Sequence, residues 1–313
     1  MQLKNKKIIL TGSCGFICQE MTRQIFSENP SDFICIDKMS YMSDDTFHKE
    51  NNIPVHKIDI CSEETARLIV EFKPDIIIHA AAESSVDVSI NDPSLFVRSN
   101  VFGTVNILNA ILKMKNMPLL IAISTDEVYG DKLIGWSKED DPRMASSPYS
   151  ASKLSAEHFV ESYGRTYNLP YLITRSSNNY GPYQHHEKLI PRIIQNILAS
   201  KKIPVYGQGN QERDWITSKD NCEGIISVIE KYHKNDIFNI GGHETTKNID
   251  IIKQICNLMD VSSDEFITYV EDRKGHDLRY AISCDKVFEA TGWAPKTSLE
   301  AGLRNTIEWY RSR

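Results

Sequence analysis

Thr11-Gly12-Ser13-Cys14-Gly15-Phe16-Ile17-Cys18 joins a short apolar run to a helical stretch, so Lys7–Thr11 is predicted as a strand and Phe16–Phe26 as a helix. Glycines between a strand and a helix allow a tight turn and let the backbone approach a pyrophosphate at the helix N-terminus. Asp37 follows Gly15 by 22 residues, and this spacing places a carboxylate on the ribose hydroxyls of a dinucleotide. The stretch therefore predicts a βαβ unit that binds NAD, because Asp37 would repel the 2′-phosphate of NADP.

Further strands and helices alternate along the first half of the chain. The run Asp75–His79 is β-branched without polar alternation, which is typical of a parallel strand covered on both faces. This alternation predicts an α/β fold with a Rossmann-type, doubly wound parallel sheet. After about residue 175 the pattern becomes irregular, and we expect a smaller, partly interleaved C-terminal substrate domain over 176–313 beside an NAD-binding domain over 1–175. The remaining predicted elements are strands at Phe33–Ile36, Leu119–Ser124 and Tyr171–Arg175 and helices at Pro93–Met114 and Tyr149–Tyr167.

Composition excludes several classes of protein. The 313 residues carry 36 basic and 42 acidic side chains, a net charge of −6, so no broad basic surface for nucleic acid is expected. The seven cysteines form no C-x-x-C pair, which favours reduced thiols over a zinc site or a disulfide framework. The N-terminal apolar stretch Ile8–Leu10 is too short for a signal peptide, and no apolar run approaches the length of a membrane span. We therefore expect a cytoplasmic protein without membrane attachment.

A second motif is Tyr149-Ser150-Ala151-Ser152-Lys153, in which Tyr149 and Lys153 share one face of a helix. A nearby ammonium can lower the pKa of a phenol, so that the tyrosine acts as a base near neutral pH. Such a pair occurs by chance in a chain of this length and needs a partner. Thr125 supplies it, because it follows a predicted strand at the edge where open α/β sheets bind ligands.

At these residues the chain resembles the extended short-chain dehydrogenase/reductases that act on nucleotide sugars, and within them the dTDP-glucose/UDP-glucose 4,6-dehydratases. The resemblance runs almost the whole length of the chain, in eight blocks that keep the order found in the family. They are TGSCGFIC at 11–18, AAAESSVD at Ala80–Asp87, STDEVYG at 124–130, PYSASK at 148–153, RSSNNYGPYQHHEKLIPR at Arg175–Arg192, PVYGQGNQERDW at Pro204–Trp215, NIGG at Asn239–Gly242 and EDRKGHDLRYAIS at Glu271–Ser283.

The adjacent carboxylic acids Asp126 and Glu127 distinguish this subfamily, since the resemblance implies that relatives which only epimerise C4 lack the pair. It implies one carboxyl as general acid and the other as general base of an elimination. After C4 is oxidised, Glu127 would remove the C5 proton and Asp126 would protonate the leaving C6 hydroxyl. Two neighbouring carboxyls in a closed site also push their pKa values apart. Without this context, an Asp-Glu pair after a strand is more simply a solvated loop or a helix cap.

The resemblance also implies roles for further residues, one position at a time. Thr125 would hold the C4 hydroxyl, Tyr149 would take its proton, and Lys153 would bind the nicotinamide ribose. NAD would stay bound and be regenerated in each cycle. The implied cofactor-binding residues are Gly12, Gly15, Phe16, Ile17, Asp37, Lys38, Ser40, Asp59, Ile60, Ala80, Ala81, Ala82, Ser99, Tyr149, Lys153 and Asn179. The implied substrate-binding residues are Ser84, Thr125, Asn178, Lys188, Leu189, Pro204, Tyr206, Arg213, Asn248, Asp272, Arg273 and His276.

Several positions depart from the family pattern. Ser85 and Val88 stand where bacterial dTDP-glucose enzymes are expected to carry His and Arg, and Lys274 replaces a proline. Cys18 takes the place of the third glycine, where a small side chain still allows close packing of helix on strand. The segment Arg175–Asn179 and the missing third glycine resemble UDP-glucose dehydratase domains of the eukaryotic type. This resemblance favours UDP-glucose over dTDP-glucose as the substrate.

The sequence thus predicts a lyase, an NAD-dependent nucleotide-glucose 4,6-dehydratase that assembles as a homodimer through the helices 93–114 and 149–167. Two alternatives remain, a C4 epimerase or decarboxylase on the same fold and a catalytically silent NAD-binding module. Asp126-Glu127 argues against the first, and the intact Thr125, Tyr149 and Lys153 argue against the second. No metal site is expected, because His79, His185, His186 and His276 lack the spacing of metal ligands.

Overall fold

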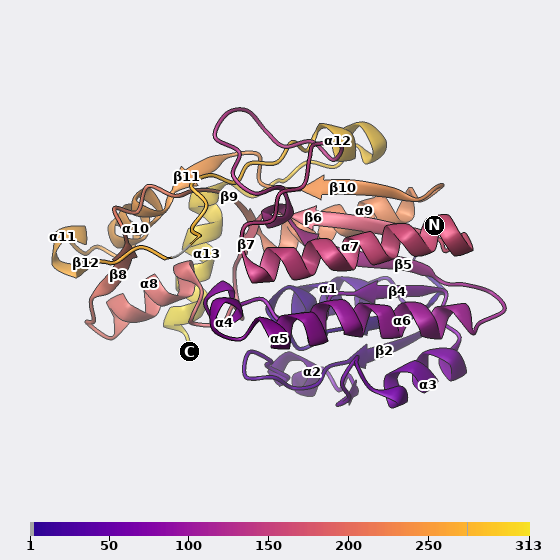
Figure 1. The fold of residues 1–313 in the computed structure, drawn as a ribbon. Coiled ribbons are helices and arrows are strands. Elements are labelled where there is room, and N and C mark those ends of the chain that lie inside the picture. Colours follow the sequence, from indigo (N-terminus) through magenta and orange to yellow (C-terminus); the bar gives the residue numbers. More distant parts are fainter. Residues whose placement is uncertain (1–2, 274) are drawn as a thin grey trace.

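A seven-stranded parallel sheet forms the centre of the protein, whose computed structural model describes residues 3–273 and 275–313. Its strand order is β10-β6-β5-β4-β1-β2-β3, so the direction of winding reverses between β1 and β4 (Figure 1). This order confirms the doubly wound, Rossmann-type sheet. The strands are β1 (Lys7–Thr11), β2 (Asp32–Ile36), β3 (Val55–His56), β4 (Ile76–His79), β5 (Leu119–Thr125), β6 (Tyr171–Ser176) and β10 (Asp236–Ile240).

The central strands β1, β4, β5 and β6 are buried on both faces because helices cover both sides of the sheet. On β1, Ile8 and Leu10 pack into one apolar cluster and Ile9 into the other, as the two-residue period of a strand requires. The first cluster lies under α1 (Phe16–Ser27), α9 (Ser218–Glu230) and α12 (Asp285–Thr291). The second lies under α3 (Glu63–Phe72), α6 (Gly103–Leu112) and α7 (Pro148–Tyr167). The β-branched run that predicted β4 reflects this double coverage.

A smaller layer with its own apolar core lies beyond the carboxyl ends of the strands, at the left of Figure 1. The chain enters this layer after β6 but returns to the central sheet through β10, which pairs with β6. The boundary between two domains at residue 175 remains a prediction. Strand β10 follows that boundary in the sequence but belongs to the central sheet, so the two parts of the chain are interleaved. The elements of this layer are β7 (Asn178–Tyr180), α8 (Leu189–Leu198), β8 (Ile203–Tyr206), β9 (Glu212–Thr217), β11 (Thr245–Lys247), α10 (Asn248–Leu258), α11 (Ser263–Phe266), β12 (Ile267–Val270) and α13 (Leu299–Arg311).

The helix predicted over Pro93–Met114 is divided by a π-helical turn. It consists of α5 (Pro93–Phe96), the π turn Val97–Phe102 and α6. The turn carries Asn100, whose side chain accepts a hydrogen bond from the Glu83 amide at 2.8 Å and donates to the Glu83 carbonyl at 3.0 Å. These hydrogen bonds between Asn100 and Glu83 coincide with the π turn. The spacing of apolar residues along the helix does not predict them. The remaining short helices are α2 (Thr46–Glu50), α4 (Val86–Asn91) and the 3₁₀ turn Asp126–Tyr129.

This interrupted helix is relevant to the expectation that no segment of the chain spans a membrane. Among the described residues, the stretch Pro93–Leu112 is long and apolar enough to cross a bilayer by length and composition alone. Half of its most apolar window is buried in the fold, and a core helix passes the same test. Contacts with α3 and α7 account for its apolar character.

Gly302 allows α13 to approach β7 and gives a test of the second layer. A Cβ at this position would lie 2.7 Å from Cζ of Tyr180 and still closer to its hydroxyl. We predict that Gly302→Ala lowers the free energy of unfolding by about 1–3 kcal/mol, although alanine is the better helix former. Chemical denaturation measures the change. Asn305→Ala, on the exposed face of α13, is the control and should be neutral or slightly stabilising; equal behaviour of the two variants would contradict the packing argument.

Candidate active site

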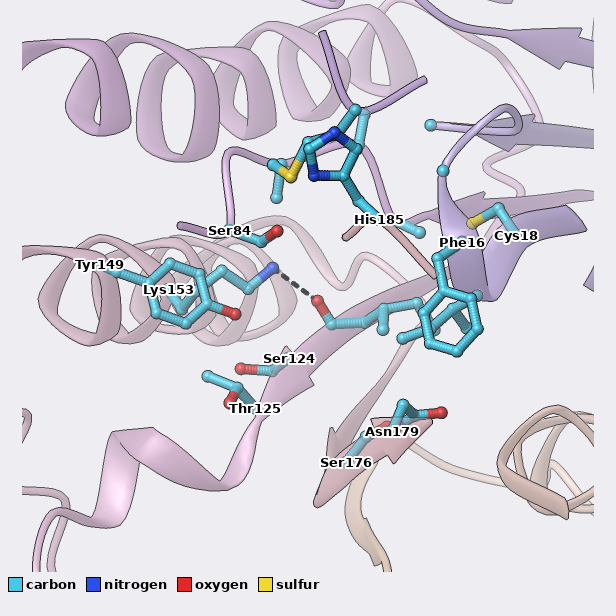
Figure 2. A pocket seen from close by; sticks show the side chains of 18 of the residues that line it. Phe16, Cys18, Ser84, Ser124, Thr125, Tyr149, Lys153, Ser176, Asn179 and His185 are labelled. Atoms are coloured by element: carbon cyan, nitrogen blue, oxygen red, sulfur yellow. Dashed lines mark hydrogen bonds between the residues drawn. The ribbon is translucent and has the colours of Figure 1, made fainter. Parts of the chain in front are cut away.

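A cleft opens at the carboxyl ends of the central strands, beside the point between β1 and β4 where the direction of winding reverses (Figure 2). It has two connected parts, here called the sheet part and the outer part. The glycine turn, the segment after β4, the end of β5 and the start of α7 line the sheet part. Helices α4 and α8 and strands β8 and β9 line the outer part. Four residues belong to both parts: Ser84, Glu127, Asn178 and Lys188. Open α/β sheets bind ligands at this position.

The turn between β1 and α1 has the features of an anion-binding site. Gly12 has φ of +71°, and a Cβ there would lie 2.7 Å from the Cα of Ala81, so only glycine fits. Helix α1 begins at Phe16 with no side-chain cap and no acidic residue in its first turn, which leaves amide donors for a bound anion. Cys18 is buried and lines the cleft, so the position of the third glycine accepts a thiol without displacing α1.

Asp37 lies directly after β2, contacts this turn and lines the sheet part of the cleft. Its carboxylate accepts hydrogen bonds from the amide of Cys14 at 3.0 Å, the amide of Met39 at 2.7 Å and the hydroxyl of Ser43 at 2.8 Å. The predicted contact with a ribose would therefore add to an existing structural role. The neighbouring Lys38 forms an ion pair with Glu83 at 2.5 Å.

Two residues predicted for the site do not line it. Asp59 accepts a hydrogen bond from the Cys61 amide at 2.8 Å, while the adjacent Ile60 faces the cleft. Asp272 accepts from His276 at 2.7 Å and from Gln211 at 3.0 Å, so it orients cleft residues from behind. The other predicted site residues line one or both parts of the cleft. Lys274, a departure noted in the sequence, lies outside the described residues.

Several polar residues that line the cleft were not identified from the sequence. Buried atoms of Gln211, Trp215 and Ser177 have no hydrogen-bond partner within the described part of the chain. Gln211 and Trp215 lie in the outer part and Ser177 in the sheet part. Buried polar groups without partners indicate a missing ligand or water. All three fall inside sequence blocks that resemble the family, which is the signal that could have identified them.

Tyr149 and Lys153 project from the first turns of α7 towards Thr125 (Figure 2). A capping box between Ser147 and Ser150 fixes the start of this helix. The Lys153 ammonium donates to the carbonyl of Ile123 at 2.6 Å, and removal from water lowers the pKa of Lys153 to about 8.

The expectation that Lys153 lowers the pKa of Tyr149 is not met in this structure. Burial raises the pKa of Tyr149, and the charge of Glu127 raises it further, while a hydrogen bond with Thr125 opposes the rise. The Lys153 ammonium is directed at Ile123 instead. The charges of Glu127 and Asp126 therefore act on the pKa of Tyr149. The spacing of Tyr149 and Lys153 along α7 does not reveal this effect.

Asp126 and Glu127 start the 3₁₀ turn after β5, and their surroundings differ. Asp126 is 3% exposed, and its Oδ2 atom has no partner among the described residues. Burial raises the pKa of Asp126 well above its ordinary value, and the charges of Glu127 and Asp214 raise it further. Burial also raises the pKa of Glu127, but Arg213, Lys188 and Arg273 oppose this rise. Asp126 is therefore the better proton donor and Glu127 the better acceptor.

The outer part of the cleft carries the cations. Arg213 is 6% exposed, stacks on Tyr280 with its guanidinium carbon 4.2 Å from the ring centre, and donates to the Asp277 carbonyl at 2.9 Å. Lys188 donates to the Ser84 carbonyl at 2.8 Å, and Arg273 pairs with a carboxylate of α4. Together with His276, these groups can hold a phosphate-bearing ligand. Within the described residues no cluster of His, Cys, Asp and Glu has the geometry of a metal site.

Comparison with known proteins places the chain among nucleotide-sugar enzymes. Residues 9–306 match the family model described as GDP-mannose 4,6 dehydratase. dTDP-glucose 4,6-dehydratase 1 of Escherichia coli K12 is 40% identical, over 98% of this chain and 93% of its own length. The crystal structure of DesIV, the dTDP-glucose 4,6-dehydratase of Streptomyces venezuelae with NAD bound, superimposes with a TM-score of 0.94 at 34% identity, covering 98% of this chain and 97% of that one. The UDP-glucose 4-epimerase of Thermus thermophilus with NAD, 25% identical, has a TM-score of 0.89 and covers 97% and 99%.

The raised pKa of Asp126 gives a prediction about stability. The folded protein holds a proton on Asp126 that the unfolded chain releases at lower pH, so the contribution of Asp126 to stability falls as pH rises above the usual carboxyl range. Asp126→Asn should therefore raise Tm, by an increment that grows from acidic to neutral pH. Thermal unfolding at a series of pH values measures this increment.

Asp141→Asn is the control for this experiment. A hydrogen bond from Lys132 lowers the pKa of Asp141, so this variant should lose stability as pH rises towards neutral. If the Tm difference of Asp126→Asn does not depend on pH, the buried carboxyl is not protonated as described.

Proposed function

The chain belongs to the nucleotide-sugar 4,6-dehydratases of the extended short-chain dehydrogenase/reductases, and on that premise we propose that it dehydrates dTDP-glucose to the 4-keto-6-deoxy sugar with NAD as cofactor. The observation that carries the proposal is the pair formed by the buried Asp126 and the half-buried Glu127, beside Tyr149 and Thr125. Oxidation at C4 requires a hydroxyl-binding group and a base, and loss of water from C5 and C6 requires a second acid and base. An epimerase needs only the first set.

The choice of dTDP-glucose reverses the preference drawn from the sequence departures. Curated relatives that match along the chain, such as those of Escherichia coli and Neisseria meningitidis, are dTDP-glucose 4,6-dehydratases. Ser85, one of the departures, caps α4 by accepting from the Val88 amide at 3.5 Å. A local role in helix capping explains Ser85 without reference to the nucleobase.

The sheet part of the cleft fits the cofactor. The glycine turn, the uncapped start of α1 and Asp37 suit a pyrophosphate and a ribose, and Asn179 leaves a buried oxygen without a partner towards the same space. NAD, when bound there, would accept a hydride from C4 and return it to C6. Ala80–Ala82, Ser99 and Lys153 would hold its nicotinamide end.

The residues around β5 would then carry the proton transfers. Tyr149 takes the proton of the C4 hydroxyl, and Thr125 holds the same oxygen. Glu127, with three cations nearby, removes the C5 proton, and Asp126 donates its proton to the C6 hydroxyl as water leaves. When C6 is reduced, the proton held by Glu127 returns to C5. Arg213, Lys188 and Arg273 hold the diphosphate and keep Glu127 closer to its ionised form.

The compartment proposed for this enzyme is the reducing cytoplasm. All seven cysteines are free thiols, and six of them are buried. Free thiols persist where the compartment is reducing.

The assembly proposed is a homodimer through the exposed faces of the π turn and α7. Val97 is 57% exposed, Phe102 54% and Phe159 39%. Apolar side chains grouped on neighbouring helices indicate an interface. Light scattering should give twice the mass of one chain, and Phe102→Asp should shift the protein towards the monomer. A monomer mass for the unmodified protein at high concentration would contradict the dimer.

Two substitutions separate the oxidation step from the elimination step. Asp126→Asn keeps the shape of the side chain but has no carboxylic proton to donate, so oxidation at C4 should proceed while water loss falls by about 10²–10⁴-fold. Absorbance of reduced cofactor should then build up on mixing with dTDP-glucose. Tyr149→Phe blocks the first step, so turnover should fall without that absorbance.

Both variants must first be shown to be folded and loaded with NAD. Mass spectrometry of the sugar nucleotide then measures the loss of water directly. If Asp126→Asn accumulates no more reduced cofactor than Tyr149→Phe, Asp126 acts in binding or oxidation and not in the elimination.

A further inference from the structure

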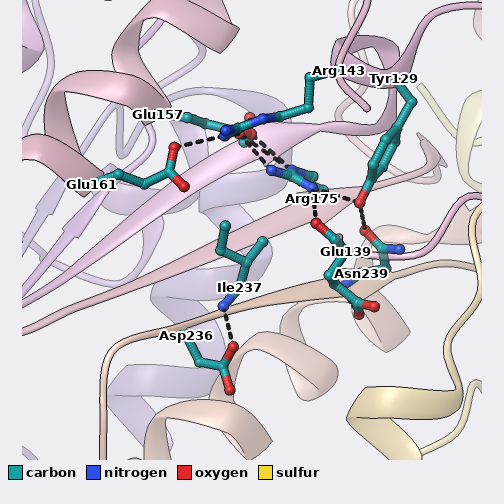
Figure 3. Close-up of polar contacts among 10 residues, drawn as sticks. Tyr129, Glu139, Arg143, Glu157, Glu161, Arg175, Asp236, Ile237 and Asn239 are labelled. Carbon is teal, nitrogen blue, oxygen red and sulfur yellow. Dashed lines mark hydrogen bonds and ion pairs between the residues drawn. The ribbon is translucent and has the colours of Figure 1, made fainter. Parts of the chain in front are cut away.

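Glu157 is a buried carboxylate on α7 that does not line either part of the cleft. It lies one helical turn after Lys153 and two turns after Tyr149, so the three share one side of the helix. Its side chain is held from two strands at once, because the Ser124 hydroxyl donates to Oε1 at 2.5 Å and Arg175 donates through Nε and Nη2, the shortest contact being 2.8 Å (Figure 3). A carboxylate with so many partners has a defined position.

These contacts tie α7 to the end of β5. Ser124 and Arg175 are register partners on β5 and β6, and Glu157 bridges them. Lys153 donates to the carbonyl of Ile123, the residue before Ser124. Two side chains of α7 are therefore attached to consecutive residues of β5, immediately before Thr125.

Arg175 is held in turn by groups from other elements, as Figure 3 shows. The arginine is fully buried and donates to the Tyr129 hydroxyl at 2.6 Å and to the Glu139 carbonyl at 3.0 Å. Tyr129, at the end of the 3₁₀ turn with Asp126 and Glu127, donates to Asn239 of β10 at 2.8 Å. The network thus contacts both the helix of Tyr149 and the turn of the acid pair.

We infer that Glu157 is a positioning residue for the dehydration, which sets the placement of Tyr149 and Lys153 against Thr125 and maintains the positive charge of Lys153. The inference rests on the proposed function for its kinetic consequences only. Glu157 does not line the cleft itself, so it acts through Lys153, Ser124 and Arg175.

The charges around Lys153 agree with this role. Removal from water lowers the pKa of Lys153 to about 8, and the carboxylate of Glu157 opposes that decrease. From β4, the neutral His79 faces the same ammonium, whose charge adds to the effect of burial in lowering the pKa of His79. The groups facing Glu157 are Arg175 from β6 and Arg143 from the loop before α7. Without the Glu157 charge, Lys153 would lose its proton at a lower pH.

The test is a titration of Lys153 by NMR of isotopically labelled lysine in the NAD-loaded protein, with the resonance assigned by Lys153→Met. Glu157→Gln should move the titration of Lys153 to lower pH, since it removes the carboxylate that favours the charged form. The alkaline limb of kcat against pH should move with it. Glu161→Gln, one turn further along α7 and also paired with Arg143, is the matched control and should leave the titration unchanged.

Glu157→Asp separates position from charge and keeps a partner for Arg175. The shorter side chain cannot reach Ser124 and Arg175 together, so kcat should fall by about 10–100-fold while Lys153 titrates near its original pH. An unchanged titration in folded Glu157→Gln, or an unchanged kcat in Glu157→Asp, would overturn the inference. Failure of the unmodified protein to dehydrate dTDP-glucose would refute the proposed function instead, and the NMR titration would still decide the role of Glu157.

Discussion

Three consecutive residues at the end of β5 determine where the chemical groups of this protein lie. The carbonyl of Ile123 receives the Lys153 ammonium, the hydroxyl of Ser124 contacts Glu157, and Thr125 caps the turn that begins with Asp126. Ile123 makes its contact through the backbone and Ser124 through the side chain, so both residues can reach the same helix, α7. The parallel sheet keeps β5 rigid by pairing it on both edges, and α7 is positioned against that rigid edge.

The distribution of charge in the cleft follows from this arrangement. The inner groups, Asp126 and Tyr149, are removed from water and gain little from cations, so the pKa of each is raised. Cations collect in the outer part, where Arg213 and Lys188 offset the effect of burial on Glu127. A gradient from protonated acids to paired cations suits a ligand with a neutral sugar at one end and a diphosphate at the other.

Local patterns predicted those elements of the fold that local chemistry determines. The β-branched run before His79 predicted β4, and the glycine turn with Asp37 predicted residues that line the sheet part of the cleft. The π turn at Val97–Phe102 was not predicted, because it coincides with hydrogen bonds between Asn100 and the distant Glu83. The three-residue strand β11 is too short for a periodic signal. The resemblance assigned Asp272 to the substrate diphosphate, but its side chain contacts His276 from behind the cleft, because a match of sequence blocks does not tell which side chain faces inward.

The central claim is that one site oxidises C4, eliminates water and returns the same hydrogen to C6. Incubation with dTDP-glucose carrying deuterium at C4, followed by mass spectrometry and NMR of the product, tests it most directly. The account predicts a product that has lost one water and carries the deuterium at C6. A product that has lost water but released the deuterium to solvent, or an unchanged substrate in the presence of the NAD-loaded protein, would contradict the account.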